Sequence, residues 1–442
     1  MKRVALFAVG AALFSAPAAA DQPVYQWSGL YVGGQAGYAM VNGRWPDIIY
    51  SDGITQNFGA EGFGGGVFAG YNHVGGNWLI GGEAEANVSD LEQQFGSSSL
   101  GPLYLQDWSA GARLRLGFLA SLSSLFYASV GATVAHFDYT KGVYSYPKPD
   151  TMPETYYGSL DQVLTGLQLG AGIEAFVTPQ LSVRVEADFT HYSDGIIHYY
   201  KRPEDSSTYA DTPFRLSPDT LVARVGVAYH PGWLGQSQTG TEQPIRQSWQ
   251  GFYAGADSGV SMLNSFEDFD PRVHAPLRPY YTFVNGAVMG GAHAGYNWQS
   301  GRLVAGVEVS GEGPLSELGT GSGERETWSA AVRGRLGIVT ADNVLFYGAL
   351  GWAVGGFDYS GLFPSSSGFP NYLGNIFTKQ GIQIGAGTEA FLSPHLSASV
   401  EGVYTVYGSQ DIYLEGSVPP YPNIVVTPHT LEGRVGVAYH FN

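Results

Sequence analysis

The residues in this chain that could do chemistry are acidic and basic side chains placed two positions apart. Arg113 and Arg115 are separated by one leucine, and Glu83 and Glu85 are separated by one alanine. In an extended strand, residues i and i+2 lie on the same face, so each pair points to one side of its strand. Buried charges persist only when opposite charges pair with them. The spacing therefore predicts ion pairing along one face of a sheet.

Enzymatic chemistry is not indicated by any strong motif. The sequence contains no Gly-x-Ser-x-Gly, no His-Glu-x-x-His, no phosphate-binding loop and no calcium-binding loop. A lipid hydrolase would have to use His191 with Ser193 and Asp194. The chain contains a second, similar segment, described below, in which the corresponding residues 407–409 are Tyr-Gly-Ser, without histidine. We predict that the chain is not an enzyme. The hydrolase remains an alternative, which loss of hydrolysis in His191→Ala would support.

Histidine and tyrosine also gather near this point, and both are ligands for iron. The residues are His191, Tyr192, His198, Tyr199 and Tyr200. Their spacing matches no rigid metal or haem motif, and tyrosine-rich loops are also good protein-contact surfaces. We predict no cofactor and no metal.

The elements that must position the charged residues occur twice. Arg224-Val-Gly-Val-Ala-Tyr-His230 returns as Arg434-Val-Gly-Val-Ala-Tyr-His440, and Trp27-x-Gly-x-Tyr31 returns as Trp249-x-Gly-x-Tyr253. A repeat this long indicates duplication of a whole folding unit. Successive landmarks lie 222, 225, 220, 215 and 210 residues apart, and each change falls across a long connection. Strands and short turns keep their length, while exposed loops vary.

Each copy contains eight strand-like runs. They lie near 29–40, 59–72, 76–88, 107–119, 124–138, 162–176, 180–192 and 217–230, and near 251–262, 283–297, 302–311, 327–339, 344–359, 378–392, 396–407 and 427–441. In each copy the connections after the second, fourth and sixth runs are short, and the others are long and rich in Pro and Tyr. Short turns at one rim and long loops at the other are typical of outer-membrane barrels. A soluble lipocalin-like barrel would also alternate apolar and polar residues, but it has no reason to segregate loop lengths.

The apolar side of each strand is expected to face lipid, and the polar side the barrel interior. Leu114 and Leu116 alternate with Arg113 and Arg115, and the polar side mixes glycine with both signs of charge. This mixture suits the narrow interior of a small barrel. The predicted interior charge network comprises Glu83, Glu85, Arg113, Arg115, Glu174, Arg184, Glu186, Asp188, Arg224, Glu308, Arg333, Arg335, Glu389, Glu401 and Arg434. The alternative is a solvated polar face without a network.

Aromatic residues near the strand ends fit the interfacial girdles of membrane barrels, because their rings are apolar with one polar group. The candidates are Tyr31, Tyr71, Trp78, Trp108, Tyr229, Trp298, Trp328 and Tyr439. The general preference of strands for aromatic residues explains any one of them equally well.

The ends and composition indicate export. Lys2 and Arg3, an apolar run and Ala18-Ala19-Ala20 have the pattern of a cleaved signal peptide, predicted over residues 1–20. No later run is long and apolar enough for a transmembrane helix. Loss of the two basic residues takes the net charge from −17 to about −19, so nucleic acid is not an expected partner. The 442 residues include no cysteine, which removes disulfides and thiol chemistry.

Together these motifs resemble a known family. Trp-x-Gly-x-Tyr-x-Gly, Gly-Tyr-Asn before the first short turn, Arg-x-Arg-Leu-Gly and Arg-Val-Gly-Val-Ala-Tyr are similar to those of small eight-stranded, porin-like outer-membrane proteins of Gram-negative bacteria. These porin-like surface antigens are related to opacity proteins and to the membrane domain of outer-membrane protein A. The resemblance covers nearly all the mature chain twice and implies an antiparallel up-and-down transmembrane β-barrel in the outer membrane. The chain departs from the family pattern in two ways. It contains two copies, and Asn442 follows the aromatic Phe441 at its end.

The predicted domains are a signal peptide at 1–20, a first barrel at 21–230, a linker at 231–248 and a second barrel at 249–442. The alternative is one sixteen-stranded barrel. Two filled barrels imply a structural or surface-interaction role through long extracellular loops, whereas one wide barrel implies a general diffusion porin. Expected partners are outer-membrane lipid and lipopolysaccharide, the barrel-assembly machinery during biogenesis, and extracellular protein ligands.

Overall fold

The fold is given by a computed structural model, which describes residues 25–49, 55–93, 103–146, 154–201, 210–231, 248–269, 282–318, 324–340, 344–359, 376–412 and 424–441. The predicted signal peptide and most of the predicted linker lie outside these ranges. None of the described residues belongs to a helix long and apolar enough to span a bilayer.

The first copy forms an antiparallel sheet that closes on itself. Its strands are β1 (Gly29–Ile49), β2 (Thr55–Gly75), β3 (Trp78–Gln93), β4 (Leu103–Leu119), β5 (Ser124–Tyr146), β6 (Glu154–Phe176), β7 (Leu181–Tyr192), β8 (Gly195–Lys201) and β9 (Ala210–Tyr229). Both β7 and β8 pair with β6 and β9, so they are two parts of one barrel strand. The barrel therefore has eight strand positions.

The second copy repeats this plan. Its strands are β10 (Gly251–Phe269), β11 (Thr282–Ser300), β12 (Leu303–Glu317), β13 (Arg325–Val339), β14 (Val344–Asp358), β15 (Ile376–Phe391), β16 (Leu396–Tyr407), β17 (Gln410–Ile412) and β18 (Ile424–His440). Strand β17 continues the position of β16 by pairing with β18. The first hairpin turn of each short-turn rim has a glycine at positive φ, Gly76 at 62° and Gly301 at 61°.

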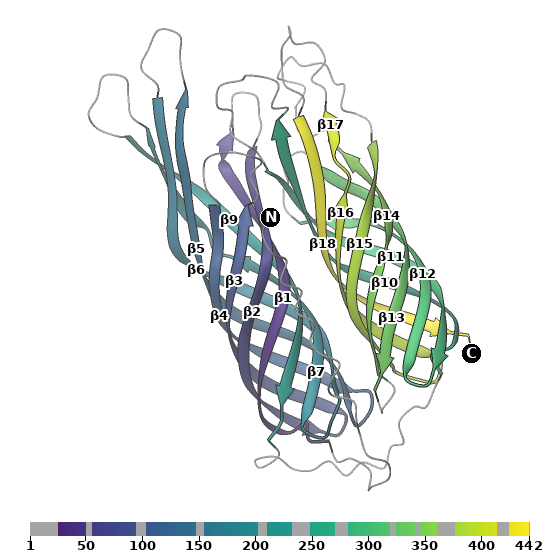
Figure 1. Ribbon diagram of the computed structural model, residues 1–442. Helices are drawn as coiled ribbons and strands as arrows, with labels where there is room; N and C mark the ends of the chain where they lie inside the picture. The colour runs from purple at the N-terminus through teal and green to yellow at the C-terminus, as the bar shows by residue number, and fades with distance from the viewer. Residues whose placement is uncertain are drawn as a thin grey trace.

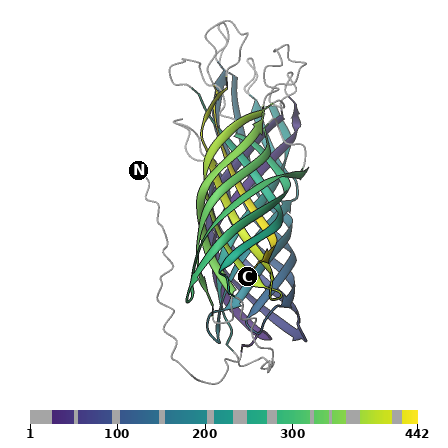
Figure 2. The ribbon, with the colours of Figure 1, turned by 90° about the vertical axis from the view of Figure 1, so that its right-hand side faces the viewer.

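Each copy closes through its own first and last strands. In the first, β1 pairs with β9 from Val32↔Tyr229 to Arg44↔Ser217. In the second, β10 pairs with β18 from Tyr253↔His440 to Phe269↔Ile424. These ladders confirm two tandem eight-stranded barrels and exclude the single sixteen-stranded barrel. Figure 1 shows the barrels side by side with roughly parallel axes, and the turned view of Figure 2 shows their strands inclined to those axes.

Alternate residues face outwards and inwards as the sequence pattern predicts. On β4, Leu114 and Leu116 are 63% and 58% exposed, whereas Arg113 and Arg115 are buried. Side chains of alternating strands point to opposite faces, so the exposed apolar residues form the outer wall. That wall is the surface that membrane barrels present to lipid.

Candidate functional site: the charged interior of each barrel

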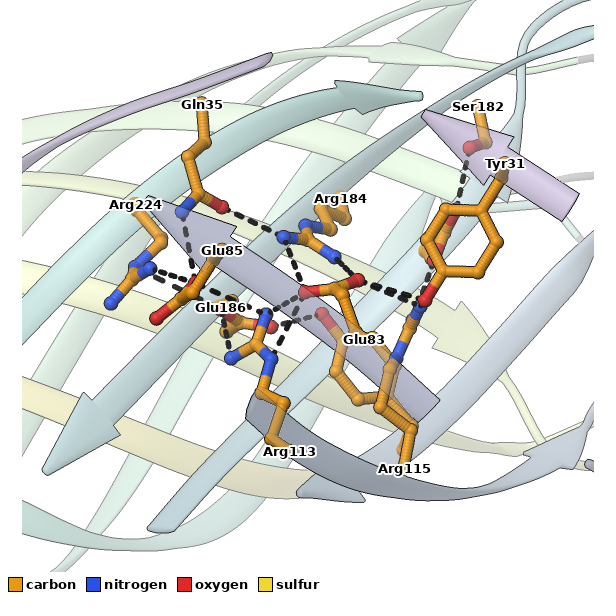
Figure 3. Close-up of polar contacts among 12 residues, drawn as sticks. Tyr31, Gln35, Glu83, Glu85, Arg113, Arg115, Ser182, Arg184, Glu186 and Arg224 are labelled. Carbon is orange, nitrogen blue, oxygen red and sulfur yellow. Dashed lines mark hydrogen bonds and ion pairs between the residues drawn. The ribbon is translucent and has the colours of Figure 1, made fainter. Parts of the chain in front are cut away.

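The structure places all fifteen predicted network residues on inward-facing positions, and all are buried. In the first barrel they come from β3, β4, β6, β7 and β9, so the network crosses the lumen (Figure 3). Buried carboxylates and guanidinium groups lose their hydration, which only close pairing and full hydrogen bonding can replace. The contacts of each group therefore determine what the interior can do.

Glu83 is the centre of the first barrel's network. Its carboxylate accepts hydrogen bonds from Arg113 at 2.6 Å, from Arg184 at 2.6 Å and from the Tyr31 hydroxyl at 2.8 Å. Arg115 lies 3.4 Å from the same carboxylate. Since Glu83 is on β3 and Arg184 is on β7, this cluster joins strands across the barrel (Figure 3).

A second set of contacts crosses the lumen beside the first. Arg113 donates to Glu186 at 2.9 Å and to Asp188 at 3.1 Å. Arg224 donates to Glu85 at 2.8 Å and pairs with Asp188 at 3.0 Å. Two guanidinium groups thus reach both Asp188 and neighbouring carboxylates, leaving the acids neutralised by fixed cations.

A third set lies nearer the short-turn rim. Arg115 donates to Glu174 at 2.6 Å, and the Ser182 hydroxyl donates to the other oxygen of Glu174 at 2.6 Å. The Ser182 oxygen is also 3.0 Å from His230 Nε2. This chain of contacts ties β4, β6 and β7 to the residue that follows β9.

The second barrel carries an equivalent network. Arg333 contacts Glu308 and donates to Glu401 at 2.7 Å, and Arg434 donates to Glu401 at 2.8 Å. Arg335 donates to Glu389 at 2.8 Å. Every arginine of the predicted set therefore has a carboxylate partner in its own barrel.

Aromatic and apolar residues fill the space on both sides of the network. Trp27 is fully buried at the short-turn rim, where it donates to the Leu122 carbonyl at 2.9 Å and packs on Phe176. Beyond the network, Phe137 and Leu164 belong to a buried apolar cluster inside the barrel. A cavity of about 50 Å³ lies between the network and this apolar cluster, and it is large enough for water. The equivalent rim of the second barrel is filled by Trp249 with Phe391.

The prediction of a girdle position was wrong for one residue, Tyr31. Tyr31 is 1% exposed and faces inwards, because its parity on β1 is that of Gln35 and not that of the exposed Val32. The other seven candidates are all exposed: Tyr71, Trp78, Trp108, Tyr229, Trp298, Trp328 and Tyr439.

The sequence interpretation also missed several interior residues. Gln35 donates to Glu85 at 3.0 Å and accepts from Arg184 at 2.7 Å. The guanidinium carbon of Arg184 lies over the Phe68 ring, 3.6 Å from the ring centroid. Neither Gln35 nor Phe68 carries a charge, but both lie on the inward parity of their strands. Repetition of the Trp-x-Gly-x-Tyr motif was the available signal for Trp27 and Tyr31.

The candidate hydrolase residues each have separate partners. His191 Nδ1 lies 2.6 Å from Asp219, Asp194 accepts from Ser217 at 2.5 Å, and the Ser193 hydroxyl contacts Thr165. Among the residues that the structure describes, no group of three or more acidic, histidine or cysteine side chains is placed to hold a metal ion. The side chains of His198, Tyr199 and Tyr200 lie outside the described set.

The family model described as "Outer membrane protein beta-barrel domain" matches residues 6–230 and again residues 237–441. The two matches coincide with the two closed barrels and together cover most of the chain. The match is therefore to a duplicated domain rather than to one long barrel.

Curated relatives agree with this assignment. The "22 kDa outer membrane protein" of Rhizobium leguminosarum bv. viciae is 32% identical over 177 residues, which are 39% of this chain and 72% of that protein. The "31 kDa outer-membrane immunogenic protein" of Brucella melitensis biotype 1 is 29% identical over 221 residues, covering 44% of this chain and 84% of that protein. Both relatives are outer-membrane proteins by name.

Among solved structures, the Pseudomonas putida toluene transporter TodX aligns over 93% of this chain and 90% of its own. Its TM-score is 0.30 at 10% identity, so no argument about function rests on it. The family match, the relatives and the closed barrels together place the protein in the outer membrane. The chain belongs to the outer-membrane protein β-barrel domain family, with one complete barrel in each half.

Proposed function

We propose that this protein is a non-enzymatic structural and surface-contact element of the outer membrane, and not a general diffusion porin. The observation that carries this proposal is the bridge of ion pairs across the lumen. Arg113 on β4 reaches Glu186 and Asp188 on β7, and Arg184 on β7 reaches Glu83 on β3. An eight-stranded barrel is just wide enough for its own side chains to fill.

The same ion pairs argue against catalysis in the interior. A general acid or base must exchange a proton with a substrate, and a nucleophile must reach one. Here the carboxylates of the predicted network are engaged by guanidinium groups, and Trp27 and Trp249 fill the short-turn rims. The surfaces left for function are the outer wall and the opposite rim, where the sequence has its long connections.

The proposed partners follow from these two surfaces. The apolar outer wall suits outer-membrane lipid and lipopolysaccharide, and folding into the membrane requires the barrel-assembly machinery. The long, tyrosine-rich connections suit extracellular protein ligands, because tyrosine combines contact area with hydrogen bonding. The acidic net charge of −17 argues against nucleic acid as a partner.

Planar-bilayer recording in molar salt tests the closed lumen. The mature protein is expected to give no large, long-lived current steps. Arg113→Ala with Arg184→Ala removes two lumen-crossing cations and should increase the frequency of small openings. Arg325→Ala is the matched control, because Arg325 pairs with Glu317 and Asp358 on the exposed surface and should leave recordings unchanged. Large steps from the unaltered protein would overturn the proposal.

A deletion strain of the protein's own host tests the surface role. We expect loss of the protein to increase sensitivity to detergent with chelator, and the full chain to restore resistance. A chain with residues 147–153 and 360–375 shortened loses no residue of a described strand, and retained heat-modifiable gel mobility would show that its barrels fold. Restoration by this chain would leave only the structural role, whereas failure to restore would support contact through the loops. A strain with unchanged sensitivity would contradict the structural role.

A further inference from the structure

One part of the outer wall is buried, although its residues have the lipid-facing parity. Met40, Leu221, Met262 and Leu431 are 0–1% exposed and form one apolar cluster from both barrels. On the same strand as Met40, outward-facing Val32 is 53% exposed. The two barrels therefore cover each other over this patch, as their side-by-side position in Figure 1 indicates.

Two asparagine side chains make the same contact in opposite directions across this patch. Asn42 donates to the Asn285 carbonyl at 2.7 Å, and Asn264 donates to the Ala60 carbonyl at 3.2 Å. The repeat offsets of 222 and 225 make Asn264 the counterpart of Asn42, and Asn285 the counterpart of Ala60. The same hydrogen bond therefore occurs twice across the patch, donated once by each barrel.

Small residues repeat this reciprocity where the barrels come closest. A Cβ added to Gly402 would lie 2.4 Å from the Ala223 Cβ, and one added to Gly433 would lie 2.6 Å from the Ala187 Cβ. Gly402 is the counterpart of Ala187, and Gly433 is the counterpart of Ala223. Small residues at a membrane interface allow backbones to approach closely. At both crossings an alanine of the first barrel meets a glycine of the second.

Near the short-turn rim, counterpart residues of the two barrels belong to the same cluster. Ala175 and its counterpart Ala390 belong to one buried cluster, against which Phe126 and its counterpart Phe346 pack. Contacts in which residue i meets residue j and j meets i define a two-fold, isologous interface. The two halves are therefore arranged as a homodimer would be, although they are one chain.

A polar cluster at one end of the interface breaks this symmetry. Glu61 has the outward parity of Phe63, which is 71% exposed, yet Glu61 is 4% exposed. Its carboxylate accepts from the Tyr404 hydroxyl at 2.8 Å and lies 2.9 Å from His429 Nδ1. The Tyr404 ring also packs against Tyr38 with centroids 4.8 Å apart. A carboxylate on a lipid-facing position is costly unless it is covered and paired.

The counterpart end carries different residues. Glu61, Tyr404 and His429 correspond to Gly286, Phe189 and Asp219, respectively. These three line a small cavity, together with Asn42 and Met262, and Asp219 pairs with His191 of its own barrel. The inter-barrel carboxylate cluster is thus built once, from one residue of the first half and two of the second.

We infer that the β1–β2–β7–β9 face of the first barrel and its counterpart on the second are a self-complementary dimer interface. The Glu61–Tyr404–His429 cluster makes each half select the other half instead of a second copy of itself. Two first halves would bring Glu61 against Phe189 and Asp219, leaving the carboxylate without a donor and close to another acid. Specificity of this kind depends on penalising the wrong pair as well as favouring the right one.

Disulfide trapping in the full chain tests the interface, because the sequence has no cysteine of its own. A protease site is placed within residues 232–247, and cysteine pairs are introduced as A223C/G402C and A187C/G433C. Oxidised outer-membrane fragments are cut at the site and run on a non-reducing gel. Both pairs should keep the halves joined, because a shift of about 1 Å between the barrels takes each pair of Cβ atoms to disulfide distance. The control pair V130C/L350C, at exposed counterpart positions, should let them separate. Separation with both interface pairs would overturn the interface.

The Glu61–Tyr404–His429 cluster is tested in the cut protein without introduced cysteines. The measurement is the half-life of the pair of halves in mild detergent. Glu61→Ala and Tyr404→Phe should each shorten that half-life on the order of tenfold, the upper range for one polar contact in a membrane. His136→Ala is the control, because it removes contacts with Asp107 and Asp161 on the exposed wall of the first barrel, and it should leave the half-life unchanged. Retention of heat-modifiable gel mobility by both halves shows that the barrels are intact.

Exchange between differently tagged cut chains completes the test. The symmetrised variant Glu61→Gly, Tyr404→Phe and His429→Asp gives both ends of the interface the same residues. It should allow two first halves to pair, whereas the unaltered chain should give only mixed pairs of first and second halves. Equal exchange by the two proteins would contradict the role of the cluster.

Discussion

Close to the short-turn rim, the two barrels make the same interior contacts with the same residue types. Tyr31 donates to Glu83 at 2.8 Å, and its counterpart Tyr253 donates to Glu308 at 2.7 Å. The serine, histidine, arginine and second glutamate of this layer also recur. They are Ser182, His230, Arg115 and Glu174 in the first barrel, and Ser397, His440, Arg335 and Glu389 in the second.

The next layer differs. Arg184 and Asp188 of the first barrel are replaced by Ser399 and Val403, so one cation and one anion are lost together. Gln35 becomes Asp257, which lies 3.8 Å from Arg434 and 3.0 Å from His293. Arg434 also has Glu312 at 3.6 Å.

This difference shows which property the interior must keep. In the first layer the individual residues are retained, and they lie beside the buried tryptophan that fills the rim. In the second layer the residues change while every arginine keeps a carboxylate partner, because a buried arginine without one would cost several kcal/mol.

The largest expected effect follows from replacing the first-layer glutamate that recurs in each barrel, Glu83 in the first and Glu308 in the second. Glu83→Ala removes the acceptor of Arg113, Arg115 and Arg184, and should lower the free energy of unfolding by about 3–5 kcal/mol. Glu308→Ala removes one acceptor from Arg333 and one from Arg335, which keep Glu401 and Glu389 respectively, so it should cost less. Urea unfolding in micelles, with protease protection of each half, measures both. A larger loss for Glu308→Ala would contradict the comparison.

Converting the second layer of the first barrel towards that of the second is expected to have an intermediate effect. Arg184→Ser removes the contacts with Glu83 and Gln35 and should cost about 3 kcal/mol. Adding Asp188→Val removes an excess acid and should recover part of that loss. Additive losses in the double variant, measured by the same unfolding assay, would show that charge balance does not govern this layer.

A smaller, matched effect is expected in the first layer. Ser182→Ala and Ser397→Ala each remove a hydroxyl that donates to a buried carboxylate, so each should cost about 2 kcal/mol. Because the two environments are the same, the losses should agree within about 0.5 kcal/mol. Calorimetric melting temperatures provide the measurement, and a clear inequality between the two serines would argue against a shared layer.

The smallest effect is expected at the hairpin glycines. Gly76→Ala and Gly301→Ala place a side chain at positive φ, which should cost about 1 kcal/mol in each barrel. Open space surrounds both positions, so no clash adds to this cost. Equal small shifts in the urea midpoint are predicted, and a loss as large as that of Glu83→Ala would reveal a role beyond the turn.

Much of this fold was predictable because membrane barrels alternate residues strictly. The inward position of Arg113 and the outward position of Leu114 follow from parity alone. Parity also places Tyr31 inside, but its aromatic character near a strand end suggested a girdle position. The predicted end of the first strand near residue 40 was also early, because β1 continues to Ile49 after the apolar alternation stops.

Other features depend on neighbours that a single strand cannot reveal. Closure into two barrels depends on whether β9 pairs with β1 or with β10. The sequence cannot decide between them, because both strands have the same alternation of apolar and polar residues. The sequence of a single strand likewise does not show which of its outward-facing residues are exposed. Met40 and Val32 share a face, but only Met40 meets the second barrel. Glu61 on a lipid-facing position was the available signal that this part of the wall is covered.

The most direct test of the central claim asks which strands close each barrel. Ala36 opposes Val225 on the β1–β9 ladder, and Ser258 opposes Val435 on the β10–β18 ladder. Opposed side chains on neighbouring strands are close to disulfide distance. In one variant carrying cysteine at all four positions, peptide mapping after oxidation should find the bonds 36–225 and 258–435. Bonds 36–435 and 225–258 would instead join the two halves into one sixteen-stranded barrel and contradict the two closed barrels.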